Sequence, residues 1–176
     1  MASDTRIVKW KLRIPKKALV ALYMFALPVL CHAKNNCPWI NEATTGGLLG
    51  GTAVNEFTDA TASQPAVCKF TYDGPGVTRT LVVTVEVAAA PKERLAIVAR
   101  TCGPDAAPLQ AIGNEAQVCM ADVRRAGPGE RVVGRVRDQV FTITLSSTLK
   151  NDPLLTRDEL RARSYTAAEQ VAGNLF

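Results

Sequence analysis

The cysteines are the residues of this chain whose types and spacing most clearly predict a chemistry. Cys31 lies in an apolar N-terminal segment, and four more follow it: Cys37, Cys68, Cys102 and Cys119. An even number of cysteines in an oxidising compartment predicts two disulfides. Of the three ways to pair four cysteines, we expect the sequential one, Cys37 with Cys68 and Cys102 with Cys119, because it closes the two shorter loops. A zinc site of four thiolates is the alternative, but no paired C-x-x-C spacing supports it.

The scarcity of histidine excludes the commonest hydrolase sites. His32 is the single histidine of the sequence, and it lies in the same N-terminal segment. If that segment is removed, no imidazole remains for a Ser-His-Asp triad, a Cys-His pair or a zinc ligand. A mechanism that uses carboxylates alone, as in glycosidases, stays open, although no acid pair stands out. The sequence therefore predicts no catalytic residue, no cofactor and no metal site.

Arginines at alternate positions of one predicted strand are candidates for anion binding. Arg131, Arg135 and Arg137 share one face of that strand, and Arg124 and Arg125 lie across the preceding loop. Guanidinium groups in this arrangement suit an anionic lipid or glycan head group. The alternative is a solvated sheet face on which the arginines pair with Glu130 and Asp138 and cover apolar surface with their stems.

An antiparallel meander in residues 112–147 must position these arginines. Large apolar residues alternate with threonines in 140–145, which is the period of a half-buried strand. The run 131–137 alternates in the same way, and the loop 126–129, with its Gly-Pro-Gly, breaks the ladder before it. Asp138-Gln139 is the predicted hairpin turn.

The remaining elements extend this meander into an α+β domain. Pro38 predicts a helix from Cys37 that ends at Gly50-Gly51. Thr156 and Glu159 match a capping box at the start of a terminal helix. Strands are expected at 52–57, 66–72 and 81–87, a turn at 73–76 and a central helix within 88–99. The terminal helix presents one apolar stripe, formed by Leu160, Ser164, Ala168, Val171, Ala172 and Leu175. The predicted fold is a twisted antiparallel sheet of about six strands with N-terminal, central and C-terminal helices packed on it.

Residues 1–33 have the composition of an export signal. Six lysines and arginines precede an apolar run, 18–30, which is followed by Cys31-His32-Ala33. Small residues at Cys31 and Ala33 suit cleavage after Ala33. An uncleaved membrane anchor is the alternative, although the run is shorter than the roughly 20 residues that span a bilayer. A lipoprotein signal is less favoured, because Leu30 stands where a lipobox has a small residue.

Removing this segment changes the charge balance. The formal net charge of +5 comes from 21 basic and 16 acidic residues, of which six and one lie in 1–33. The remaining 143 residues are nearly neutral, so the composition predicts no nucleic-acid partner. A chain of that length is enough for one domain with its own core. We therefore expect residues 34–176 to form a single exported domain, periplasmic or secreted.

The order of elements resembles a group of exported bacterial envelope domains. A cysteine-bearing helix that ends in Gly-Gly, a cysteine-bearing strand, the turn Gly113-Asn114-Glu115-Ala116, a hairpin and an alanine-rich terminal helix follow one another. The chain is similar in this to actinobacterial lipoproteins of unknown function and to the extracellular sensor domain of a mycobacterial Ser/Thr kinase. The resemblance spans most of 37–176. It implies a twisted antiparallel sheet, two disulfides and no established catalytic residues, but this sequence has neither a lipobox nor a kinase domain.

These features favour a non-enzymatic binding or sensing domain of the bacterial cell envelope, whose ligand the sequence does not identify. One alternative is a structural or protein-interaction component of an envelope assembly, which would present a large exposed apolar patch or sheet edge. The other is a small hydrolase without histidine. A deep pocket with two nearby carboxylates would favour the hydrolase, and a shallow groove without them would favour the binding domain.

Overall fold

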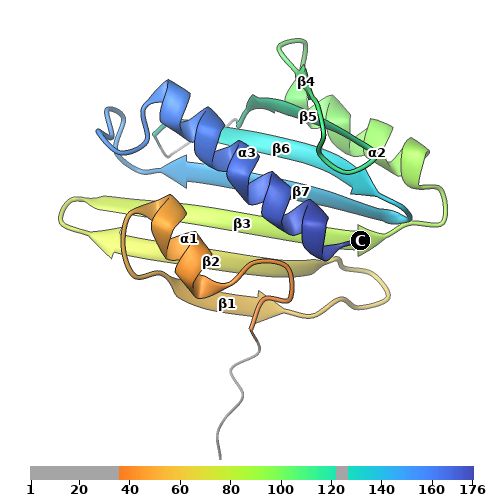
Figure 1. Ribbon diagram of the computed structural model, residues 1–176, viewed down its shortest axis with the longest axis horizontal. Helices are drawn as coiled ribbons and strands as arrows, with labels where there is room; N and C mark the ends of the chain where they lie inside the picture. Colours follow the sequence, from red (N-terminus) through yellow and green to blue (C-terminus); the bar gives the residue numbers. More distant parts are fainter. Residues whose placement is uncertain (1–35, 122–126) are drawn as a thin grey trace, which may run out of the picture. The chain divides into compact units, whose positions relative to one another are not determined.

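The fold is an open seven-stranded antiparallel sheet with helices on both faces (Figure 1). The structure, a computed structural model, describes residues 36–121 and 127–176. The strands lie in the order β1-β2-β3-β7-β6-β5-β4. Their bounds are β1 Val54–Thr58, β2 Ala66–Gly74, β3 Val77–Val87, β4 Ala107–Leu109, β5 Glu115–Met120, β6 Gly129–Val136 and β7 Gln139–Ser147. The predicted class is confirmed, but the sheet has seven strands rather than about six.

The additional strand is β4, which the sequence did not predict. Its three residues include Pro108, which has no N–H to donate. Because β4 lies at the edge of the sheet and pairs with β5 alone, that missing donor breaks no ladder.

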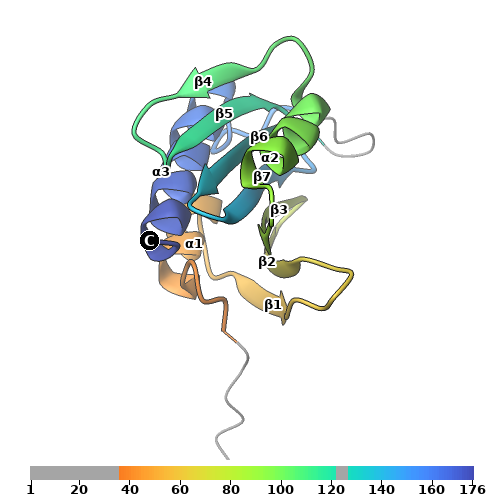
Figure 2. The same cartoon turned by 90° about the vertical axis from the view of Figure 1, so that its right-hand side faces the viewer.

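Three α-helices cover the two faces unequally. Helix α1 (Glu42–Leu49) and helix α3 (Arg157–Asn174) lie on one face, and helix α2 (Pro91–Ala99) lies on the other (Figure 2). The larger core lies beneath α1 and α3 and includes Phe70, Phe141 and Ile143. A smaller core beneath α2 contains Leu95, Val133 and Val140 with a disulfide. We call these the α3 face and the α2 face of the sheet.

The helix ends follow local capping chemistry. Helix α1 begins later than predicted, because Asn41 rather than Pro38 starts it: the Asn41 Oδ1 accepts the Thr44 N–H at 2.8 Å. Gly50, with φ of 80°, ends it as expected. Helix α2 lies within the predicted range 88–99 and starts at Pro91. Thr156 caps α3 by accepting the Glu159 N–H at 3.4 Å, and the predicted apolar stripe of α3 is buried.

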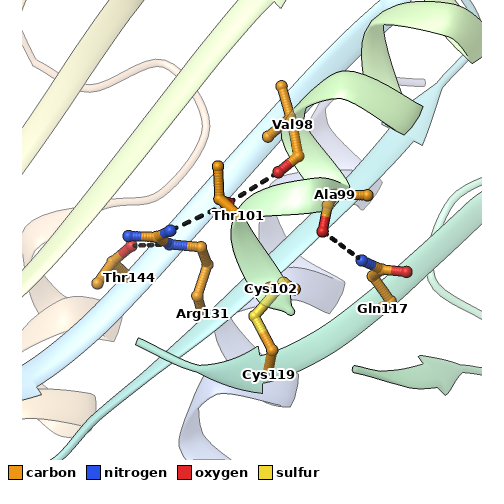
Figure 3. Close-up of a disulfide and its surroundings, with 8 residues drawn as sticks. All are labelled: Val98, Ala99, Thr101, Cys102, Gln117, Cys119, Arg131 and Thr144. Atoms are coloured by element: carbon orange, nitrogen blue, oxygen red, sulfur yellow. Dashed lines mark hydrogen bonds between the residues drawn. A yellow bond between two sulfur atoms is a disulfide. The ribbon is translucent and has the colours of Figure 1, made fainter. Parts of the chain in front are cut away.

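Each disulfide ties a helical segment to the sheet. Cys37, in the segment before α1, is bonded to Cys68 of β2. Cys102, in the 3₁₀ turn Arg100–Cys102 after α2, is bonded to Cys119 of β5 (Figure 3). This is the sequential pairing, and disulfides of this kind are typical of an oxidising compartment such as the periplasm or the extracellular space. Within residues 36–121 and 127–176, no helix is long and apolar enough to cross a bilayer.

Candidate functional site

The structure keeps Arg131 and Arg135 on one face of β6, but each donates hydrogen bonds to other side chains of the fold. Arg131 lies on the α2 face, where its Nη1 donates to Thr101 Oγ1 at 3.1 Å and its Nε to Thr144 Oγ1 at 3.4 Å (Figure 3). Arg135 lies on the same face and donates from Nε to Glu115 Oε1 at 2.8 Å. Both guanidinium groups are thus bound to other side chains of the fold.

The prediction of a shared arginine face is wrong for Arg137. The β6–β7 turn is at Arg137-Asp138 rather than at Asp138-Gln139, and Arg137 takes a positive φ of 54° in it. Its guanidinium carbon lies 5.8 Å from the centre of the Phe176 ring. The expected pairing with Glu130 is also wrong, because Glu130 lies on the opposite face of β6. Arg124 and Arg125 fall outside the described residues.

A short motif before β5 accounts for this end of the hairpin. Gly113 has a φ of 58°, and a Cβ there would lie 2.5 Å from the Arg135 carbonyl oxygen, so only glycine fits without a shift. The Asn114 N–H donates to that same oxygen at 2.8 Å. The Asn114 Oδ1 accepts the Arg137 N–H at 2.6 Å, which holds the strained turn.

The next two residues of the motif also hold β6. Glu115 pairs with Arg135, and Ala116 lies buried opposite Gly134, which packs against Phe141. The β6–β7 hairpin is therefore stabilised by the motif Gly113-Asn114-Glu115-Ala116. We call this part of the β5–β6 pair the clamp end.

The opposite end of the β5–β6 pair borders a cavity of about 810 Å³. A volume of this size suits a small-molecule ligand. Its walls come from the end of β5, the start of β6, the loop 148–156 and the first turns of α3. The main apolar lining residues are Val118, Met120, Pro153, Leu155 and Leu160, and the ionisable ones are Asp105, Glu130, Lys150, Asp152, Arg157, Asp158 and Arg161. We call this the cavity end.

Glu130 is, with Asp152, one of two buried acidic residues among the described residues that line this cavity. It lies opposite Leu145 on β7 and Met120 on β5, so its side chain points to the α3 face together with Val132. The residue is 8% exposed. Burial raises the pKa of its carboxyl group, and the positive charges of Arg161 and Arg157 offset this only in part. No hydrogen bond joins this carboxylate to another residue in the part of the chain that the structure describes.

The orientation of α3 directs two arginines at this carboxylate. Arg157 and Arg161 lie one turn apart on one flank of the helix. On the same flank, the Tyr165 hydroxyl donates to the Gln110 carbonyl oxygen at 3.3 Å. On the other flank, Arg163 donates to the carbonyl oxygens of Gly47 and Leu48 at 2.9 and 2.8 Å. These contacts fix the rotation of α3 and thereby the positions of Arg157 and Arg161.

A buried ion pair fixes the loop that forms the third wall. Asp152 accepts from Arg79 at 2.7 and 2.9 Å and from the Ser147 hydroxyl at 2.7 Å. The Leu154 N–H also donates to Asp152, and Arg79 donates to the Leu49 carbonyl oxygen. The hydrogen bonds from Arg79 hold the pKa of the Asp152 carboxyl well below its usual range. Asp152 is therefore a permanently charged anchor of the loop, not an acid or base for a reaction.

The arrangement suits binding of a small polar molecule with an apolar part. It combines buried apolar walls, two arginines and a carboxylate that can be protonated. Cys119, which also lines it, is held in a disulfide. No group of three or more residues that could hold a metal ion occurs among the described residues.

Sequence reasoning missed this site although one signal was present. Glu130 occupies an inward position of β6, in phase with Val132 and Val136, where an apolar residue is expected. It was instead interpreted as a partner of the arginines on the opposite face. Comparison of the chain with family models, curated proteins and solved structures found no match. The assignment of a function therefore rests on the geometry of the cavity end.

Proposed function

We propose that this protein is a non-enzymatic binding or sensing domain of the bacterial cell envelope, and that its ligand occupies the cavity between β5, β6, the loop 148–156 and α3. The observation that carries the proposal is Glu130, a buried carboxylate in the wall of a cavity of about 810 Å³. Burial of a charged carboxylate costs stability, and no side-chain hydrogen bond within the described residues offsets that cost at Glu130. A ligand that contacts Glu130 would offset it.

Export is part of the same proposal. We infer that residues 1–33 are a signal peptide cleaved after Ala33, so that residues 34–176 act in the periplasm or outside the cell. The two disulfides support an oxidising location. The resemblance to actinobacterial lipoproteins and to the extracellular sensor domain of a kinase agrees with such a location.

The proposal can be tested on the full chain expressed with its own leader in a bacterial host. N-terminal sequencing of the exported product should begin at Lys34. A library of small molecules should then be screened by NMR, with the methyl groups of Val118, Met120 and Leu155 as reporters of the cavity. Val54 and Ile97 are exposed on β1 and α2 and serve as controls. Ligands that shift the control methyls, with no ligand shifting the cavity methyls, would contradict the proposal.

A small hydrolase is the second candidate, and the raised pKa of Glu130 is the observation that favours it. A carboxylic acid whose pKa is raised by burial can act as a general acid, with Asp158 or Asp105 of the same cavity as the second carboxyl group. Glycoside hydrolysis would require such a pair. Release of reducing ends from cell-wall glycan, abolished by Glu130→Gln, would support the hydrolase, and its absence at any pH between 4 and 8 would reject it.

A further inference from the structure

The depth and charge of the cavity indicate which class of ligand it would hold. Its floor is apolar, since Val118, Leu155 and Leu160 are all buried, and Glu130 lies among them. Its rim is charged, since Arg157 and Arg161 are exposed. A molecule with an apolar body and one charged head matches this division, with the body on the floor and the head at the rim.

The charges at the rim favour an anionic head. Asp152 is already neutralised by Arg79. Among the lining residues that the structure describes, the remaining charged groups are Lys150, Arg157 and Arg161 against Asp105, Asp158 and Glu130. With Glu130 protonated, the cationic groups exceed the anionic ones by one. Arg157 and Arg161, one helical turn apart, present planar donor groups that suit a carboxylate or phosphate. A single negative charge on the ligand therefore balances the cavity.

We propose that the cavity binds a small amphipathic anion and that binding is coupled to uptake of a proton by Glu130. This inference rests on the proposed binding function and specifies its ligand class. Two effects act in the same direction. The apolar body of the ligand displaces water from the Glu130 carboxyl group, which disfavours its charged form. The anionic head adds a like charge near it, which disfavours that form further.

Octyl compounds with different head groups test the ligand class. Octanoate, octyltrimethylammonium and 1-octanol have the same chain and differ in charge. Titration calorimetry on the exported protein at pH 6 should give octanoate an affinity at least about tenfold above that of the other two. Arg157→Gln with Arg161→Gln should reduce octanoate binding at least about tenfold. Lys69→Gln, which removes a cation from an exposed pair between β1 and β2, should leave it unchanged.

The pH dependence tests the proton coupling. Octanoate affinity should fall as pH rises above the pKa of Glu130, by up to about tenfold per pH unit. Glu130→Gln should bind octanoate with little change between pH 6 and 8. Asp158→Asn and Asp105→Asn should keep the dependence, which separates Glu130 from the other acids of the cavity. Should Glu130→Gln fail to fold, calorimetry of the parent protein in buffers of different ionisation enthalpy still measures proton uptake directly.

The outcomes distinguish the failure of this inference from failure of the proposed function. Cavity methyl shifts with octyltrimethylammonium or 1-octanol but not with octanoate would overturn the ligand class and leave a binding cavity. Octanoate binding without proton uptake, or with a pH dependence that survives Glu130→Gln, would overturn the coupling alone. If none of the three compounds, nor any molecule of the wider screen, shifts the cavity methyls, the proposed function itself is wrong.

Discussion

Polar residues have different surroundings at the two ends of the β5–β6 pair. At the clamp end, the Asn114 side chain accepts from the backbone of Arg137, and Glu115 pairs with Arg135. At the cavity end, Glu130 is more deeply buried than either of those side chains, yet within residues 36–121 and 127–176 it has no side-chain hydrogen bond, and Arg157 and Arg161 act on it through their charge. Polar groups satisfied by their neighbours belong to the scaffold. A buried carboxylate that has no such partner among the described residues is where we propose that a ligand binds.

The difference also separates the two roles of arginine in this molecule. Arg135 and Arg131 are directed at acceptors of the sheet and the adjacent 3₁₀ turn, so they hold the α2 face together. Arg157 and Arg161 lie on an exposed helix flank at a cavity rim. Four predictions test how far this contrast between a closed end and an open end extends, from the largest expected effect to the smallest.

Loss of the loop anchor should be the most damaging change. Asp152→Ala leaves Arg79 buried without its carboxylate and should lower the free energy of unfolding by about 3–5 kcal/mol. Because the folded-state pKa of Asp152 is lowered, its contribution is present above the ordinary pKa of aspartate and is lost as pH falls through the folded-state value. Urea unfolding at several acidic and neutral pH values should show this dependence in the parent and not in Asp152→Asn. Equal stability of Asp152→Ala and parent at pH 7 would contradict the role of the anchor.

At the clamp end, Gly113→Ala should cost about 2–3 kcal/mol. The new Cβ would meet the backbone oxygen of Arg135 and would also occupy a left-handed conformation. Gly76→Ala is the matched control: Gly76 has a φ of 74°, but its Cβ would meet no atom within 4 Å. The control should cost only about 1 kcal/mol, and thermal unfolding of both variants measures the difference. Equal losses would show that the close approach to β6 does not matter.

Removing the side-chain acceptor of the same clamp should have a smaller effect. Asn114→Ala leaves the Arg137 N–H without its partner and should cost about 1–2 kcal/mol in chemical denaturation. Asn114→Asp keeps an oxygen acceptor at this position and should retain most of the stability. Hydrogen exchange of the Arg137 amide should become faster in the alanine variant and stay slow in the aspartate variant. Slow exchange in both variants would mean that the turn does not depend on Asn114.

At the cavity end, Glu130→Gln should change stability least and in the opposite direction. The folded-state pKa of Glu130 is raised, so its contribution is most favourable below the ordinary pKa of glutamate and is lost as pH rises through the folded-state value. The glutamine variant lacks this loss and should be more stable than the parent at pH 8, within about 1 kcal/mol. The difference should disappear near pH 4. A less stable variant at pH 8 would mean that the Glu130 charge stabilises the fold.

Sequence patterns predicted the structure correctly where it depends on residues that are close together in the sequence. The alternation in β7, the Thr156 cap and the apolar stripe of α3 are local signals, and each appears in the structure. The turn at Arg137 could not be predicted, because an arginine with positive φ is held there by Asn114, which lies in a different segment. Strand β4 was missed because its proline is acceptable only at an edge.

The candidate site was less predictable because it is assembled from distant segments. Asp152, in one wall of the cavity, is held by an ion pair with Arg79 that joins β3 to the loop before α3, and no local pattern links the two residues. Glu130 and Arg161 come together only once α3 packs on the sheet. Glu130 interrupts the alternation of apolar residues in β6. This departure could be interpreted only once the face of β6 on which Glu130 lies was known.

The position of β7 beside β3 has a consequence for how the chain folds. Strands β1, β2 and β3 are paired in sequence order, and so are β5, β6 and β7. The two runs are joined by the β3–β7 ladder, which extends from the pair Arg79–Ser147 to the pair Val87–Gln139. The central ladder of the sheet therefore closes a long stretch of chain, and such nonlocal pairing slows folding. The N-terminal half cannot complete its sheet before residue 147 is available. In the chain that we propose to be exported, the sheet would thus stay incomplete until most of the chain has been synthesised.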